Sequence, residues 1–441
     1  MKAIVVGAGE TGFHIAQSLS NQGHSIVVID TQEEALEQVR NSLDVLAILG
    51  DGCSHRVLEE GGAKGSDFLA AVTNNDQVNI VASLLAKTYR VPRVVARISG
   101  PQQLDNPLLL KETGLYTVYP EKVVADKIVR LIEVPFASLS EVFVEGRVQM
   151  LKLEVKKGAG LEGRKLSELE RLSSWILVAH SRAGEITIPR GDTLIRSGDY
   201  VIGLGIKEAL KELEELVGPS EPKTKRVILL GGGRIGYYLL KQLSGRGISL
   251  RLVETSPQRS LDLAQEFPNV LVLKGDGTNG EVLKEAGIED ADYFVALTHD
   301  DEINILASLC AKNLGCKKVI ILSRKMDYTP IVERVGIDVT INPPLAAAGE
   351  IMRYTRGGGV LSFSLLEEGK GEILEVLVKE SSAVAGKALR DTPFPQEALI
   401  GAVVRDGKIT IPRGDTIIAP NDRVIVFMLP PAVKKIERLF G

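Results

Sequence analysis

The chain has 441 residues, of which 44% are hydrophobic and 25% are charged, and its formal net charge is −4. This composition is typical of a globular protein of about two to four domains. The scattered lysines and arginines exclude the basic surface of a nucleic-acid-binding protein. No window approaches the ~18 uninterrupted apolar residues of a membrane span, and we expect no signal peptide and a cytoplasmic location.

Strand and helix signals alternate along the first part of the chain. The run Lys2–Val6 predicts a buried strand, and the apolar spacing of residues 11–21 predicts a helix. Further strands are expected at 25–29, 45–49, 68–73, 93–98 and 116–118, and further helices at 32–41, 54–60, 76–89, 107–112 and 121–132. Such alternation predicts an α/β fold with a Rossmann-like, doubly wound parallel sheet.

From about residue 140 the pattern changes to short strands separated by Gly and Asp turns. Strands are expected at 142–144, 149–155, 175–180, 185–188 and 200–203, with short helices at 166–170 and 207–217. These segments predict a small α+β module. The stretch GPSEPKT that follows, residues 218–224, has the composition of a linker.

The whole arrangement then repeats. IVVGAGETG at Ile4–Gly12 returns as ILLGGGRIG at Ile228–Gly236, 224 residues later, and ITIPRGDT occurs at both Ile186–Thr193 and Ile409–Thr416. We therefore predict a tandem duplication of two Rossmann units and two small modules. The expected boundaries are 1–138 and 139–217 for the first repeat, a linker at 218–224, and 225–357 and 358–441 for the second repeat.

Each glycine-rich loop carries the pattern of a dinucleotide-binding site. A strand leads into Gly-x-Gly-x-x-Gly, a helix follows, and an acid, Asp30 or Glu254, stands 18 residues after the last glycine. The helix N-terminus would attract phosphates, and the acid would bind ribose hydroxyls and repel a 2′-phosphate. This favours NAD(H) or an adenine nucleotide over NADP(H); the alternative is that the glycines serve only close packing.

Other polar residues fall at strand ends beside the same crevice. Asp51 and Asp276 are candidates for adenine contact, with a plain turn-forming role as the alternative. Arg97 and Arg324 are expected at the end of the fifth strand of each sheet, where they would contact phosphate, a neighbouring subunit or a surface acid. His299 is a candidate nucleotide contact, with a structural role as the alternative.

The two loops differ in charge at their fourth position. Glu10 places a carboxylate beside the expected pyrophosphate of the first loop, whereas Arg234 places a guanidinium in the second. We hypothesise that the second loop tolerates ATP better and that the first prefers NAD(H); the alternative for Arg234 is a solvated arginine at the helix start.

No part of the sequence supplies a catalytic signature. There is no paired nucleophile and base, and the three cysteines and five histidines show no zinc or other metal-ligand spacing. We expect no catalytic residues and no metal site, which points to sensing. The alternatives are an NAD-dependent oxidoreductase with an unrecognised substrate site and a soluble nucleotide sensor with another partner.

The motifs GAGETG, GDG, TNND and ITIPRGDT, each present in two related copies, make the chain resemble the TrkA family. Its members are cytoplasmic regulatory subunits of Trk potassium uptake systems, with two RCK (KTN) units in each chain. The resemblance implies NAD(H) or ATP/ADP binding, a homotetramer built as a dimer of dimers, and gating of a TrkH/TrkG-type potassium channel subunit in the membrane. Glu10 and Glu254 depart from the single-RCK relatives, in which a loop arginine contacts the terminal phosphate, and Glu10 argues against ATP at the first loop.

The resemblance also assigns the candidate cofactor-binding residues of each repeat. The first site comprises Gly7, Ala8, Gly9, Glu10, Thr11, Gly12, Asp30, Asp51, Thr73, Asn74 and Arg97. The second site comprises Gly231, Gly232, Gly233, Arg234, Ile235, Gly236, Glu254, Asp276, Thr298, His299 and Arg324.

Overall fold

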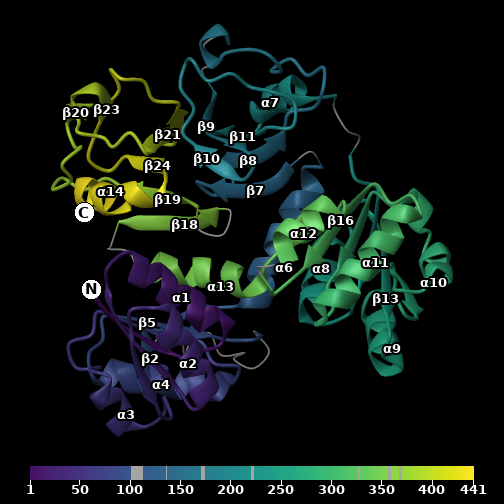
Figure 1. Ribbon diagram of the computed structural model, residues 1–441, viewed down its shortest axis with the longest axis horizontal. Helices are drawn as coiled ribbons and strands as arrows, with labels where there is room; N and C mark the ends of the chain where they lie inside the picture. Colours follow the sequence, from purple (N-terminus) through teal and green to yellow (C-terminus); the bar gives the residue numbers. More distant parts are fainter. Residues whose placement is uncertain are drawn as a thin grey trace.

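Among the residues that it describes, the computed structural model has two six-stranded and two five-stranded β-sheets, which alternate along the chain, and one two-stranded sheet (Figure 1). The predicted helix at 107–112 lies outside the described residues. The structure describes residues 1–100, 113–135, 137–169, 174–219, 223–325, 328–355, 359–366 and 370–441.

The first sheet is parallel, with strand order β3-β2-β1-β4-β5-β6. β1 lies in the middle, where Ala3 pairs with Ile26 of β2 and with Phe68 of β4. Because helices cover both faces, the apolar run at residues 4–6 is almost fully buried. The elements are β1 (Lys2–Val6), α1 (Glu10–Asn21), β2 (Ser25–Asp30), α2 (Glu33–Ser42), β3 (Leu46–Leu49), α3 (His55–Glu60), β4 (Phe68–Ala71), α4 (Asp76–Thr88), β5 (Arg93–Arg97) and β6 (Tyr116–Val118).

The second parallel sheet repeats this topology, with strand order β14-β13-β12-β15-β16-β17. In both sheets the strand order reverses at the central strand, and the crevice at the carboxyl ends opens there. The prediction of two Rossmann-like units is confirmed. The elements are β12 (Arg226–Leu230), α8 (Arg234–Leu243), β13 (Ser249–Glu254), α9 (Pro257–Glu266), β14 (Leu271–Lys274), α10 (Gly280–Glu285), β15 (Tyr293–Ala296), α11 (Asp301–Asn313), β16 (Lys318–Leu322), α12 (Thr329–Arg334) and β17 (Val339–Ile341).

The two small modules are antiparallel sheets, ordered β10-β9-β11-β8-β7 and β18-β19-β24-β21-β22. In each ITIPRGDT copy the threonine hydroxyl accepts a hydrogen bond from the arginine amide, Arg190 to Thr193 and Arg413 to Thr416, both at 2.8 Å. The shared motif therefore forms the same tight turn twice. The strands and helices are β7 (Ala137–Phe143), β8 (Val148–Glu154), β9 (Trp175–Arg182), β10 (Glu185–Thr187), β11 (Tyr200–Ile206), α7 (Leu210–Val217), β18 (Val360–Leu366), β19 (Gly371–Leu377), β20 (Lys387–Ala388), β21 (Ala398–Arg405), β22 (Lys408–Thr410), β23 (Ile417–Ile418), β24 (Arg423–Met428) and α14 (Val433–Phe440).

The strand predicted at 142–144 is partly wrong. β7 begins at Ala137, and Val144 and Glu145 form a turn with positive φ angles of 54° and 52°. A β-branched residue rarely adopts this conformation. Burial of the Val144 side chain and a hydrogen bond of 3.3 Å from its amide to the Glu375 carboxylate hold the turn in place. Both contacts are tertiary, so the local pattern could not reveal them.

In each repeat, the helix that follows the parallel sheet packs against the Rossmann unit of the other repeat. Helix α6 (Pro120–Glu133), which follows the first sheet, packs against α8, and helix α13 (Pro343–Met352), which follows the second sheet, packs against α1. Figure 1 shows α13 lying across α1. The two Rossmann units thus form a pair within one chain.

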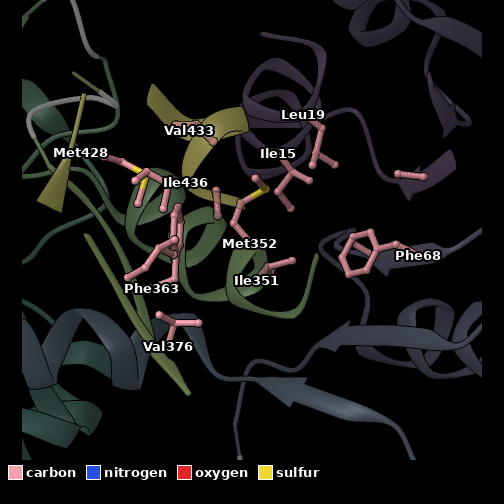
Figure 2. Packing of buried hydrophobic residues seen from close by; sticks show 14 of the residues in the cluster. Ile15, Leu19, Phe68, Ile351, Met352, Phe363, Val376, Met428, Val433 and Ile436 are labelled. Carbon is pink, nitrogen blue, oxygen red and sulfur yellow. The ribbon is translucent and has the colours of Figure 1, made fainter. Parts of the chain in front are cut away.

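Both helix contacts have an apolar core, since Ile128 of α6 is fully buried in one cluster with Leu240 of α8, and the α6 contact also has polar pairs at its edge. Ile351 and Met352 of α13 are fully buried in a core that also contains Ile15 and Leu19 of α1 and extends into the second small module (Figure 2). Along the edge of the α6 contact, polar pairs join the helices. Arg234 lies 3.5 Å from Glu121, Gln242 donates to Asp126 at 2.8 Å, and Arg246 pairs with Glu133.

The two small modules also pack together within the chain. Their sheets share one apolar core, to which Val178 and Leu204 contribute from the first module and Phe427 from the second. At Gly401 of β21, a Cβ atom would lie only 2.9 Å from Leu204 and 3.1 Å from Val178. The glycine therefore allows the close approach of the two sheets.

Candidate functional site

The first glycine-rich loop is tightly built against the sheet. Gly7 has a φ of 109°, and a Cβ atom at Gly12 would lie 1.8 Å from the Gly7 carbonyl oxygen. These two glycines are required by the turn and by the approach of α1 to it. In contrast, a Cβ atom at Gly9 would meet nothing within 4 Å. The packing of the protein does not account for Gly9, whereas backbone approach to a pyrophosphate would account for it.

The second loop has the same geometry. Gly231 has a φ of 101°, and a Cβ atom at Gly236 would lie 2.3 Å from the Gly231 oxygen. Gly232 is closely surrounded, since its Cβ atom would lie 2.4 Å from Leu263, whereas a Cβ atom at Gly233 would meet open space. The middle glycine of the motif is thus sterically free in both repeats.

Each acid after the second strand is bound to the glycine-rich loop. The Ala8 amide donates to Asp30 Oδ2 and the Gly232 amide donates to Glu254 Oε2, both at 2.6 Å. The other carboxylate oxygen accepts from the amide of Gln32 at 2.9 Å or of Ser256 at 2.8 Å. These contacts fix the acid beside the loop, where ribose hydroxyls lie in dinucleotide-binding sheets.

Asp51 and Asp276 occupy tight turns. The Cys53 amide donates to Asp51 Oδ1 at 2.8 Å, and the Thr278 amide and hydroxyl donate to Asp276 Oδ1 at 2.9 and 2.8 Å. The Thr278 contacts hold the pKa of Asp276 below its ordinary value. Both aspartates therefore form the turn, and their contact with adenine stays a prediction.

Buried asparagines, not recognised in the sequence, anchor the crevice. Asn79 is fully buried on α4; its Oδ1 accepts from the amide and the hydroxyl of Thr73, and its Nδ2 donates to the carbonyl oxygens of Thr73 and Arg97. Asn304 makes the matching contacts to Thr298 and Leu322. Each asparagine therefore ties the ends of two neighbouring strands. The recurrence of an asparagine three residues after TNND and THDD is the signal that could have found them.

Arg97 and Arg324 do not occupy equivalent backbone positions. Arg97 ends β5, as predicted, but β16 ends at Leu322, and Arg324 lies two residues beyond it. The residue equivalent to Arg97 in the second repeat is Leu322. Asn79 donates to the Arg97 carbonyl oxygen, and the equivalent Asn304 donates to the Leu322 carbonyl oxygen. Arg324 therefore does not end its strand as predicted, because the two arginine motifs differ in register by two residues, and its role in cofactor binding stays a prediction.

The two arginines nevertheless meet corresponding side chains. Arg97 donates to Asn74 Oδ1 at 3.0 Å, and Arg324 Nη2 lies 3.0 Å from His299 Nδ1. The backbone after β16 is held by a buried acid, since Asp301 accepts from the Arg324 and Lys325 amides. Both crevices thus present a guanidinium at the ends of the fourth and fifth strands.

The charges at the two helix starts are opposite and each faces the other repeat. Partial desolvation raises the pKa of the Glu10 carboxyl above its ordinary value; the Arg324 guanidinium opposes this rise and the Asp301 carboxylate adds to it. Arg234 instead pairs with Glu121 of α6. The remaining loop residues Ala8, Thr11 and Ile235 lie at the same helix starts.

Each repeat of the chain matches two known domain families. Models of the TrkA-N domain match residues 3–119 and 227–343, and models of the TrkA-C domain match residues 150–218 and 373–441. The chain belongs to the TrkA family. It is 37% identical over 450 residues to Trk system potassium uptake protein TrkA homolog 1 of Methanosarcina mazei, with all of both chains covered. It is 33% identical to TrkA of Halomonas elongata, covering all of this chain and 98% of the relative.

Solved structures agree on the fold. A GsuK channel bound to NAD is 18% identical, with a TM-score of 0.62, and covers all of this chain and 78% of that chain. A second GsuK channel structure gives a TM-score of 0.64 at 18% identity, covering 99% of this chain and 78% of that chain. The prediction of tandem RCK-type units is therefore confirmed. Within the described ranges, no helix of this TrkA-family chain has the length and apolarity needed to cross a membrane.

Proposed function

We propose that this chain is a non-enzymatic, cytoplasmic regulatory subunit that binds NAD(H) or adenine nucleotides at its two glycine-rich crevices. The observation that supports it is the open space at Gly9 and Gly233. If the glycines served packing alone, a Cβ atom at these positions would meet protein atoms, as it does at Gly12 and Gly236. The free helix N-terminus beside an acid bound to the loop fits a ribose and pyrophosphate.

Binding is tested by calorimetry with NADH, NAD⁺, ATP and ADP. Gly9→Val and Gly233→Val place a side chain where a Cβ atom meets no protein atom, so each is expected to abolish binding at its own site and leave the fold intact. Thermal unfolding of both variants is the control for an intact fold. Equal nucleotide affinity of wild type and both valine variants would contradict the proposal, as would steady NADH turnover with a small substrate.

The two sites are proposed to differ in ligand. Arg234 starts α8 and can fork onto a distal phosphate, whereas Glu10 starts α1 and repels one. The second site would therefore take ATP or ADP more readily, and the first would take NAD(H). Equal ATP affinity of wild type and Arg234→Ala would contradict this assignment.

The partner is proposed to be a TrkH/TrkG-type potassium channel subunit in the membrane, gated by a nucleotide-dependent change in the shape of an RCK ring. The support comes from the relatives, which match this chain over almost their whole length and are named Trk system potassium uptake proteins. A ligand can change the ring only through different affinities for two conformations. Co-purification of a tagged chain with membranes that contain such a transporter tests the partner.

Assembly into a homotetramer is proposed from the exposed apolar residues of α4 and α11. Val81 and Leu84 on α4 are 42% and 37% exposed, and Ile303 and Leu306 on α11 are 39% and 60% exposed. Both helices lie on the outer side of their sheets, and clustered apolar exposure of this kind marks protein interfaces. Leu306→Asp is expected to reduce the mass measured by light scattering, and an unchanged mass would exclude α11 from the interface.

A further inference from the structure

We propose that Glu121, a residue of the first repeat, is a specificity-determining residue of the second site. It holds Arg234 away from the distal phosphate of a nucleotide bound there. The inference rests on the proposed nucleotide binding and adds to it a residue from the other half of the chain.

The geometry places this acid next to the second loop. Glu121 lies in the first turn of α6, and its Oε1 is 3.5 Å from Arg234 Nη1. The Glu121 side chain is only 16% exposed, whereas that of Arg234 is 59% exposed. Among the described residues, the buried Oε2 of Glu121 has no hydrogen-bond partner. A largely buried carboxylate with one unpaired oxygen therefore has the exposed guanidinium of Arg234 as its ion-pair partner.

A bound phosphate would compete with this carboxylate. Arg234 is the first residue of α8, so phosphates that dock at the helix N-terminus lie within reach of its side chain. If Arg234 turns to the phosphate, Glu121 loses its counter-charge while it remains largely buried, which is unfavourable. If Arg234 stays with Glu121, the phosphate gains no contact with the guanidinium. Either way Glu121 lowers the affinity, and most strongly for the ligand with the most distal charge.

The remaining contacts between α6 and the second Rossmann unit lie farther from the loop. Asp126 accepts from Gln242, and Glu133 pairs with Arg246 beyond the end of α8. A phosphate at the second loop would therefore disturb the Glu121 contact and leave the Glu133 contact in place. Glu133 is the matched control, because it forms the same kind of ion pair on the same helix.

The test uses the full chain with Asp30→Ala, which weakens the first site so that calorimetry reports on the second. In this background Glu121→Gln is expected to tighten ATP binding about three- to ten-fold, ADP binding less, and NADH binding least. Glu133→Gln is expected to change none of them. In an Arg234→Ala background, Glu121→Gln is expected to have a much smaller effect on ATP affinity, because the competition for the guanidinium is gone.

Several outcomes would overturn the inference. Unchanged or weaker ATP binding by Glu121→Gln, or an equal gain with and without Arg234, would show that Glu121 does not act through Arg234. An equal gain by Glu133→Gln would show that loosening the helix contact, and not this charge, is responsible. If the Asp30→Ala protein binds no nucleotide while thermal unfolding shows it folded, the proposed function of the second site fails, and this inference fails with it.

Discussion

The two repeats share a backbone but surround their glycine-rich loops with different chemistry. Both loops place a positive-φ glycine at the end of the first strand and an acid on the second loop amide. The helix start carries Glu10 in the first repeat and Arg234 in the second, and both contacts with the helix of the other repeat have an apolar core, to which the α6 contact adds polar pairs at its edge. The two repeats therefore share the loop geometry proposed to bind a nucleotide and differ in the charges proposed to select it.

The difference between the helix contacts is expected to give the largest effect. Met352→Ala removes a fully buried side chain from the core that joins α13 to α1 and should cost about 3 kcal/mol of unfolding free energy. Arg246→Ala removes an ion pair whose side chains are 46% and 39% exposed and should cost less than about 1 kcal/mol. Urea unfolding of both variants measures the comparison. Similar losses would show that the edge ion pair contributes as much as a buried core side chain.

The buried asparagines that both repeats share should have equal effects on stability when they are replaced. Asn79→Ala and Asn304→Ala each leave the backbone groups of two strand ends without their buried partner, and each should cost about 2 kcal/mol. Asn313→Ala, at the exposed end of α11, should change stability by less than about 0.5 kcal/mol. A large loss in one repeat only would mean that the two crevices are not supported in the same way.

The loop charge should produce a smaller effect, on binding alone. Glu10→Gln removes the carboxylate beside the expected pyrophosphate and should tighten NADH and ATP binding at the first site about three-fold, with the larger gain for ATP. Glu34→Gln, an exposed acid of α2, serves as the control. Calorimetry in a Glu254→Ala background measures the change. If neither NADH nor ATP binds more tightly, Glu10 does not determine the nucleotide selectivity of the first site.

The smallest expected effect is the pH dependence of the affinity gained by Glu10→Gln. Because the pKa of Glu10 is raised above its ordinary value of 4.5, the carboxyl begins to take up a proton at a higher pH than an exposed glutamate does. The charge that repels phosphate is present above the raised pKa and is lost as the pH falls through it. The affinity advantage of Glu10→Gln should therefore shrink as the pH is lowered from neutrality into the range where carboxyl groups take up protons. A constant advantage over this range would contradict the assignment.

The fold was predictable because its signals are local and occur twice. Apolar runs such as Ile4–Val6 read as buried parallel strands, and the glycine motifs mark the strand-to-helix turns. The small modules were predicted less well, because the turn at Val144 depends on the distant Glu375 carboxylate.

The candidate sites were predictable in their loops and acids but not in their surroundings. Arg324 was misplaced because its motif resembles that of Arg97 without sharing its register. Glu121 was missed because it lies far from Arg234 in the sequence, and only the exchange of helices brings the two together. Contacts between repeats leave no periodic pattern, so sequence alone could not assign them.

The central claim is that the two proposed sites differ in the nucleotide that they prefer. Its most direct test is calorimetry of NADH and ATP with two variants, each of which keeps one site. Glu254→Ala leaves the first site intact, and Asp30→Ala leaves the second. The account predicts that the first protein binds NADH more tightly than ATP and that the ATP preference is higher in the second. The same order and ratio of affinities in both proteins, or no binding by either, would contradict it.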